Sequence, residues 1–192
     1  MGRLTGKVAL VVGSASGIGA ATARKLAAED ASVALADINL EGAERLAGEL
    51  GDRALAVHCD AEDPATIEAA VDATLSAFGR LDVLHNNAAL LTSEILGADT
   101  TAVDIDFDVW DRVMAVNVRG YLAGCKYAIP AMTEVGGGSI ICTTSAAGLE
   151  GDQMRIAYGC SKGAIMTLVK YVATQYGDHG IRCNAVAPGL VK

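Results

Sequence analysis

Residues 8–19 read VALVVGSASGIG, five apolar residues followed by a turn rich in glycine. The continuous apolar run predicts a strand buried on both faces of a parallel sheet. Gly13, Gly17 and Gly19 suit a sharp turn, a close approach of a pyrophosphate to the backbone, and tight packing of a helix on the strand. The first N–H groups of that helix would then face the phosphates. This stretch therefore predicts a dinucleotide-binding unit, although three glycines alone also fit ordinary turn chemistry.

The same alternation of short apolar runs and longer amphipathic segments continues along the chain. It predicts a doubly wound parallel sheet of the Rossmann type, in three α/β/α layers, within a single domain over residues 1–192. A long loop is expected over residues 88–106. The expected strands cover residues 8–12, 32–36, 54–58, 82–85, 138–142 and 181–186, and the expected helices cover residues 17–28, 41–50, 64–79, 109–132 and 157–176.

Composition and charge exclude several classes of protein. The chain has 192 residues, of which 52% are hydrophobic, so intrinsic disorder is not expected. With 15 Lys and Arg against 23 Asp and Glu, the formal charge is −8, and no basic run offers a surface for nucleic acid. No apolar stretch approaches the ~20 residues of a membrane span, so no membrane association is expected.

The cysteines and histidines carry no metal-site pattern. Five scattered cysteines without a CxxC pair suggest reduced thiols, and three histidines lack metal-ligand spacing. The N-terminus lacks the small-residue cleavage site of a secretory signal. We therefore expect a cytoplasmic protein without a bound metal.

An acidic residue follows the second expected strand. Asp37 lies 18 positions after Gly19, where a carboxylate hydrogen-bonds the ribose hydroxyls of a dinucleotide and repels a 2′-phosphate. The glycine turn contains no basic residue to hold such a phosphate. These features favour NAD over NADP. The alternative is that Asp37 only caps the following helix.

Tyr158 and Lys162, in the segment YGCSK, lie four positions apart and so share one face of an expected helix. A tyrosine ordinarily has a pKa of ~10, too high for a base at neutral pH, but a neighbouring ammonium favours the phenolate. The pair therefore suits proton transfer. In isolation, the better interpretation of the pair would be two residues on a helix surface.

The ordered set of motifs resembles the short-chain dehydrogenase/reductase family over essentially the whole chain. Each motif alone is weak, but every one stands at its proper strand end. Beyond the glycine turn and the Tyr–Lys pair, the resemblance rests on Asp60 after the third strand, the segment Asn86-Asn87-Ala88-Ala89, Asn117 on a long helix, Ser145 at 13 positions before Tyr158, and Pro188-Gly189 after the sixth strand.

The resemblance implies hydride transfer between a secondary alcohol or ketone and NAD. Tyr158 would be the general acid/base, and Ser145 would hydrogen-bond the same substrate oxygen. Lys162 would favour the tyrosine phenolate and bind the nicotinamide ribose, and Asn117 would position a water that links Lys162 to solvent. Thr143 and Thr144 are neighbouring hydroxyls, but the spacing to Tyr158 favours Ser145.

The resemblance also implies the contacts of the cofactor. Asp60 would contact adenine, Asn87 and Ala88 the adjacent ribose, and the residues after the sixth strand the nicotinamide region. The full expected set is Gly13, Ser16, Gly17, Ile18, Gly19, Asp37, Asp60, Ala61, Asn87, Ala88, Tyr158, Lys162, Pro188 and Gly189.

The sequence departs from the family pattern at three places. Val12 replaces the usual threonine before the first glycine, and Ala89 replaces the last glycine of the Asn-Asn-Ala-Gly segment, so Ala89 must avoid positive φ. Family members also continue past the Pro-Gly pair through a substrate-covering loop and a final strand, so we expect that segment to be truncated, disordered or absent here. Family analogy suggests a homotetramer built through the two long helices, although a monomer core would explain their apolar positions too.

Two other functions remain open at this stage. A non-catalytic dinucleotide sensor would keep the glycine turn and Asp37 but would have no use for the four catalytic positions, all of which are filled. A methyltransferase that binds S-adenosylmethionine would predict neither the Tyr–Lys pair nor Ser145. We therefore expect an enzyme acting on small or medium alcohols and ketones.

Overall fold

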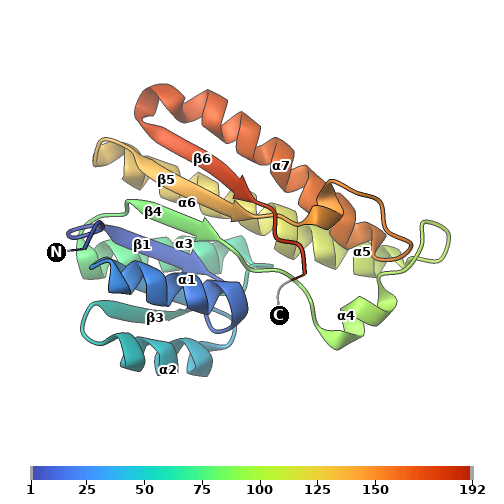
Figure 1. Ribbon diagram of the computed structural model, residues 1–192, viewed down its shortest axis with the longest axis horizontal. Helices are drawn as coiled ribbons and strands as arrows, with labels where there is room; N and C mark the ends of the chain where they lie inside the picture. Colours follow the sequence, from blue (N-terminus) through green and yellow to red (C-terminus); the bar gives the residue numbers. More distant parts are fainter. Residues whose placement is uncertain (1, 191–192) are drawn as a thin grey trace.

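The computed structural model describes residues 2–190 and contains one six-stranded parallel sheet (Figure 1). The strand order is β3-β2-β1-β4-β5-β6, so the chain winds outward from β1 in one direction and then in the other. This confirms the doubly wound prediction. The strands are β1 (Val8–Val12), β2 (Ser32–Asp37), β3 (Ala54–His58), β4 (Val83–Asn86), β5 (Gly138–Thr143) and β6 (Ile181–Val186).

Helices cover both faces of the sheet and complete the three layers. Helices α1 and α2 pack over β1, β2 and β3 on one face, and α3, α6 and α7 pack on the other (Figure 1). No helix between residues 2 and 190 is long and apolar enough to cross a membrane. The helices are α1 (Gly17–Ala28), α2 (Leu40–Leu50), α3 (Pro64–Phe78), α4 (Ser93–Ala98), α5 (Phe107–Met114), α6 (Gly120–Glu134) and α7 (Ile156–Tyr176).

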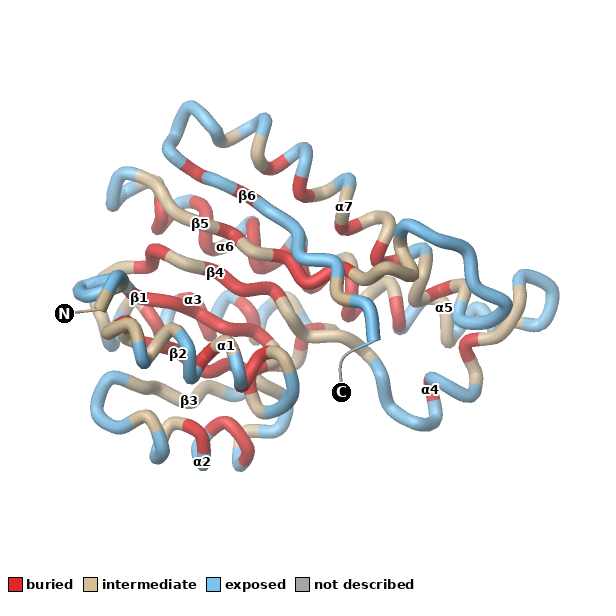
Figure 2. The backbone as a smooth tube through the Cα atoms, viewed as in Figure 1, coloured by how far each residue is buried: buried red, intermediate tan, exposed pale blue. Residues whose placement is uncertain are grey.

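Strand β1 is the centre of the core, and it is buried along its whole length (Figure 2). Because side chains alternate across a strand, Leu10 and Val12 join the apolar cluster that includes residues of α3, α6 and α7. Val11 joins the second cluster, under α1 and α2. Complete burial of a side chain of this size contributes about 1.5–3 kcal/mol. The continuous apolar run thus fixes the position of the glycine turn that follows it.

Two expectations about the middle of the chain are wrong in detail. The expected helix over residues 109–132 is α5, a π-helical turn at Ala115–Arg119, and α6. It starts earlier than expected because the Asp106 side chain accepts a hydrogen bond from the Asp108 amide, 2.8 Å away, and caps α5. The expected loop over residues 88–106 contains the short helix α4, which is capped by Thr92.

A buried carboxylate joins the beginnings of β1 and β4. Asp82 accepts hydrogen bonds from the Lys7 ammonium at 2.8 Å, from the Val8 amide at 3.0 Å, and from two nitrogens of Arg80. Burial alone would raise the pKa of Asp82, but the bonds from Arg80, Lys7 and the Val8 amide together lower it to about 2. The ionised form therefore stabilises the sheet.

We expect Asp82→Ala to lower the free energy of unfolding at neutral pH by about 2 kcal/mol, because the Val8 amide loses its acceptor and two cations lose their partner. Since the folded state lowers the pKa of Asp82, its contribution is present above pH ~4 and disappears as the pH falls towards ~2. Urea unfolding of the wild type and of Asp82→Ala, at neutral pH and near pH ~2, measures how the difference in the free energy of unfolding changes with pH. Asp72→Ala, on the exposed face of α3, is the control; equal stability of the two variants at neutral pH would contradict the expectation.

Candidate active site

A cleft of about 800 Å³ opens at the carboxyl ends of the strands, where the strand order reverses. This is the usual ligand position in an open α/β sheet. Asn117 and Gly19 are absent from the cleft wall. The other expected residues all line it, namely Gly13, Ser16, Gly17, Ile18, Asp37, Asp60, Ala61, Asn87, Ala88, Ser145, Tyr158, Lys162, Pro188 and Gly189.

The glycine turn has the backbone that its sequence predicts. Gly13 and Gly17 have positive φ angles of 83° and 53°. A Cβ at Gly13 would lie 2.6 Å from the backbone of Ala88, and a Cβ at Gly19 would overlap the Gly13 carbonyl oxygen. Gly19 therefore lets α1 pack against the turn rather than facing the cleft. The first turn of α1 holds no acidic residue, and the Ser16 side chain makes no capping bond, so this helix start suits an anion.

Asp37, at the end of the neighbouring strand β2, forms a hydrogen bond with the backbone of the glycine turn. One carboxylate oxygen accepts from the Ala15 amide and the other from the Asn39 amide, both at 2.8 Å. The alternative that Asp37 caps the next helix is wrong, because Asn39 occupies the cap of α2 and its side chain accepts from the Gly42 amide. Asp37 thus presents a negative charge at the edge of the cleft.

Asn87 connects the glycine turn to β5. Its amide nitrogen donates to the Gly13 carbonyl at 2.9 Å, and its oxygen accepts from the Thr143 hydroxyl at 3.0 Å. Ala89 stays out of the positive-φ region, as its side chain requires; Asp30 and Arg155 are the non-glycine residues with positive φ in residues 2–190. On the far side, Asp60 follows β3 and accepts from the Glu62 amide at 2.9 Å.

Lys162 is almost completely buried below the cleft. Its ammonium donates to the Thr143 carbonyl at 2.8 Å and lies 3.5 Å from the Tyr121 hydroxyl. It also lies 5.6 Å from the centre of the Tyr158 ring. Burial lowers the pKa of Lys162 to about 8, and within residues 2–190 no carboxylate forms an ion pair with it. The lysine is therefore an uncompensated positive charge beside a tyrosine.

Ser145 is the hydroxyl with a free hydrogen at the end of β5. Its oxygen accepts from the Ala147 amide at 3.2 Å, which leaves the hydroxyl hydrogen for another acceptor. The two preceding hydroxyls are engaged, because Thr143 donates to Asn87 and Thr144 donates to the Val186 carbonyl at 3.0 Å. Ser145, Tyr158 and Lys162 all line the cleft, which therefore combines a hydroxyl donor, a phenol and an ammonium.

Residues 7–192 match the family model described as short chain dehydrogenase. The chain belongs to the short-chain dehydrogenase family. A 3-alpha-(or 20-beta)-hydroxysteroid dehydrogenase of Mycobacterium tuberculosis (strain ATCC 25618 / H37Rv) is 43% identical over 191 residues, which cover 100% of this chain and 71% of that protein. A cyclohexanol dehydrogenase of Acinetobacter sp. (strain SE19) is 38% identical, covering 99% and 75%. A D-threitol dehydrogenase of Mycolicibacterium smegmatis is also 38% identical, covering 98% and 72%.

In this short-chain dehydrogenase, Asn117 lies behind the cleft and not in its wall. It is fully buried in the π-helical turn, where its oxygen accepts from the Leu90 amide at 2.9 Å and its nitrogen donates to the Ser161 hydroxyl at 3.0 Å. Each end of the side chain thus has one protein partner, and the side chain joins the loop after β4 to α7.

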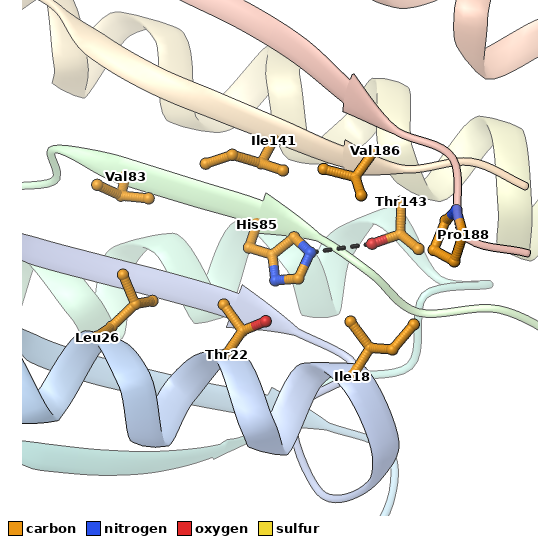
Figure 3. Close-up of a pocket in the computed structure, with 9 residues that line it drawn as sticks. All are labelled: Ile18, Thr22, Leu26, Val83, His85, Ile141, Thr143, Val186 and Pro188. Carbon is orange, nitrogen blue, oxygen red and sulfur yellow. Dashed lines mark hydrogen bonds between the residues drawn. The ribbon is translucent and has the colours of Figure 1, made fainter. Parts of the chain in front are cut away.

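A second, smaller cavity of about 250 Å³ lies between α1 and strands β4 and β5, and Ile18, Thr143 and Pro188 line both cavities (Figure 3). His85 is buried in its wall, and its Nε2 lies 2.9 Å from the Thr143 hydroxyl. Because Thr143 donates to Asn87, His85 Nε2 carries the proton of this bond. Burial lowers the pKa of His85 to about 4, so the ring is neutral at physiological pH. A single network therefore runs from His85 through Thr143 and Asn87 to the glycine turn.

Sequence reasoning missed several groups that shape the cleft. Thr143 supplies the carbonyl that holds Lys162, and the buried Tyr121 donates to the same carbonyl at 3.1 Å. The Asp99 carboxylate accepts a hydrogen bond from the backbone amide of Tyr158. Arg112 of α5 lines the cleft as a second cation. None of these belongs to a motif, and only the fold brings them to the site.

Proposed function

We propose that this chain is an NAD-dependent oxidoreductase that transfers hydride between a secondary alcohol or ketone and nicotinamide. One observation carries the proposal: Ser145, Tyr158 and Lys162 line the same cleft as the glycine turn and Asp37. A dinucleotide sensor has no use for the first three groups, and a methyltransferase has none for a Tyr–Lys pair. The coincidence of both sets in one cleft favours an enzyme.

The residues of the cleft fit a bound dinucleotide. The glycine turn brings backbone amides to the surface without a Cβ in the way, and the start of α1 favours a pyrophosphate. Asp37 would accept hydrogen bonds from the adenosine ribose, Asp60 would contact adenine, and Pro188 and Gly189 would border the nicotinamide. Nicotinamide supplies the hydride-transfer chemistry when it is bound.

The polar groups beside it would handle the proton. Oxidation of an alcohol releases a hydride and a proton, and the Tyr158 oxygen would take the proton from the substrate hydroxyl. Ser145 would donate its free hydrogen to the same substrate oxygen and hold it in place. The Lys162 ammonium would favour the phenolate form of the tyrosine through its charge. In the reverse direction, Tyr158 would protonate the oxygen of a ketone.

Asp37 supports NAD as the preferred cofactor. Its carboxylate lines the cleft and would face a 2′-phosphate, which carries negative charge. We expect Asp37→Asn to lower the ratio of kcat/KM for NAD to kcat/KM for NADP by about tenfold or more, which corresponds to about 1.4 kcal/mol. Asn keeps the shape and one acceptor oxygen, so one of the two bonds from the Ala15 and Asn39 amides is retained. Asp52→Asn, at an exposed position outside the cleft, is the control; an unchanged ratio in Asp37→Asn would contradict this role.

The names of the relatives guide the search for a substrate. They mention a hydroxysteroid, cyclohexanol and D-threitol, which all carry secondary hydroxyls. The experiment that tests the proposed function is NADH formation from NAD with a panel of such alcohols. Turnover with one of them would support the enzyme. NAD binding without turnover across the panel would favour the sensor, and raised thermal stability with S-adenosylmethionine would favour the methyltransferase.

For assembly and location, we propose a cytoplasmic homotetramer formed through α6 and α7. Two large side chains support this choice, since Leu122 of α6 is 52% exposed and Tyr171 of α7 is 63% exposed. An interface through these two helices would cover both side chains. Light scattering on the purified chain would measure the assembly.

A further inference from the structure

A buried carboxylate from another part of the chain meets the start of α7. Asp99 follows α4 and is only 2% exposed. One of its oxygens accepts from the Ala157 amide at 2.9 Å, and the other accepts from the Tyr158 amide at 2.8 Å. The carboxylate therefore binds the backbone of the tyrosine proposed as acid/base.

Helix α7 needs this external cap because its own sequence does not supply one. The first N–H groups of a helix have no partner within the helix. The residue before α7 is Arg155, whose φ is 65° and whose side chain makes no capping bond. Its amide donates to the Asp99 carbonyl at 2.9 Å, and the Ile156 amide donates to the Thr100 carbonyl. The segment at Asp99 and Thr100 thus satisfies four successive amides.

The charge of Asp99 is balanced by the helix itself. Among the residues 2–190, no lysine or arginine forms an ion pair with it. A carboxylate at a helix N-terminus is stabilised by the aligned peptide dipoles, and bonds from amides to an ionised acceptor are short and strong. The pair of bonds therefore connects the segment after α4 directly to the first turn of α7.

The segment that carries Asp99 is itself held in place by apolar packing. The Asp99 amide donates to the Ile95 carbonyl at 2.8 Å, which fixes the residue to α4. Ile95 is buried against Val113 and Ala157 in a separate apolar cluster. Leu90, Leu91 and Thr92, which lead into α4, line the cleft. One wall of the cleft is thus tied to the backbone of Tyr158.

We infer that Asp99 is a positioning residue for Tyr158: by capping α7 from outside, it sets where the tyrosine hydroxyl lies in the cleft. The inference rests on the proposed function, since it names what holds the acid/base in place. Asp99 itself does not line the cleft and so would not touch substrate or cofactor. Its effect on the reaction would pass through the tyrosine.

The test is kinetic and uses Asp99→Asn and Asp99→Ala in the full chain. We expect kcat for alcohol oxidation to fall by about 10- to 100-fold in Asp99→Ala, because a small misplacement of a reacting group costs about this much. Asp99→Asn keeps one acceptor oxygen, so its loss should be smaller. The KM for NAD should change little, since the glycine turn is untouched. Asp106→Ala removes a carboxylate that caps α5 through the Asp108 amide and is the control, with kcat retained.

A double variant separates positioning from general loss of structure. On a Tyr158→Phe background, adding Asp99→Asn should leave the residual rate unchanged, because the hydroxyl that Asp99 positions is already absent. If Asp99→Asn lowers the rate of Tyr158→Phe by the same factor as it lowers the rate of the wild type, the inference is overturned. Wild-type kcat in Asp99→Asn would overturn it too.

Hydrogen exchange keeps the inference distinct from the proposed function. If the wild type binds NAD but oxidises none of the alcohols, the proposed function fails on its own. In that case, faster amide exchange at residues 155–160 in Asp99→Asn but not in Asp106→Ala would still support the cap of α7. Unchanged exchange there would overturn it. This measurement needs no substrate and tolerates a modest loss of stability.

Discussion

Replacing Tyr158 with phenylalanine is expected to lower kcat for alcohol oxidation by about 100- to 10,000-fold, the usual worth of a positioned general acid/base. The substitution removes one oxygen and keeps the ring that packs 5.6 Å from the Lys162 ammonium. NAD binding should persist, because the glycine turn, Asp37 and Asn87 are unchanged. Steady-state kinetics and NAD titration of the same preparation measure both quantities.

Tyr176→Phe is the matched control for this prediction. It lies at the other end of α7, where its ring centre is 6.1 Å from that of His179 and far from the cleft. It should keep the wild-type kcat. Turnover of Tyr158→Phe close to that of Tyr176→Phe would remove the tyrosine from the mechanism.

Lys162→Met is expected to lower kcat/KM by at least about 100-fold without weakening the fold. The loss of activity follows because the tyrosine loses the positive charge that favours its phenolate. The fold should be unaffected or about 1 kcal/mol more stable, because a buried ammonium without a carboxylate partner is costly and methionine fills a similar volume. If Lys162→Met is inactive yet as stable as the wild type, the Lys162 ammonium serves activity and not the stability of the fold.

The pH dependence of this variant has a defined sign. Burial lowers the pKa of Lys162 to about 8 in the folded chain, while an unfolded lysine has a pKa of about 10.4. Between these values the unfolded state binds more protons, so this lysine makes the wild type more stable as the pH rises. Lys162→Met should lose that rise, and Lys170→Met, at an exposed position on the same helix, should keep it. A clearly destabilised Lys162→Met would contradict the cost assigned to the buried charge.

The sheet could be predicted because its signals are local. The apolar runs at β1, β3 and β6 give the observed strand bounds, and the observed bounds of α1 also match. The break between α5 and α6 could not be predicted, because its contacts come from distant segments. A Cβ at Gly120 would lie 2.6 Å from the Ala61 carbonyl oxygen, and Asn117 bonds to the loop after β4 and to α7. Proline usually kinks or ends a helix, yet Pro130 lies within α6.

The residues of the cleft also divide into those with a local sequence signal and those that only distant contacts bring to the site. Those in motifs at strand ends were predictable, because parallel strands bring their carboxyl ends to one edge of the sheet. The groups that hold them were not: Asp99 bonds to an amide 59 positions away, and Lys162 meets Tyr121 at a separation of 41. Sequence spacing carries no signal for such pairs. The motifs thus indicate the expected chemistry, and the fold shows which groups contact the residues of the motifs.

We propose that hydride passes within this cleft from a carbinol carbon to nicotinamide. The most direct measurement uses a secondary alcohol from the panel with deuterium on its carbinol carbon, followed by mass spectrometry of the NADH formed. We expect one deuterium in the reduced nicotinamide, and we expect the yield in the same time to fall by about 100-fold or more in Tyr158→Phe. NADH that forms without deuterium, or label transfer that persists undiminished in Tyr158→Phe, would contradict the mechanism.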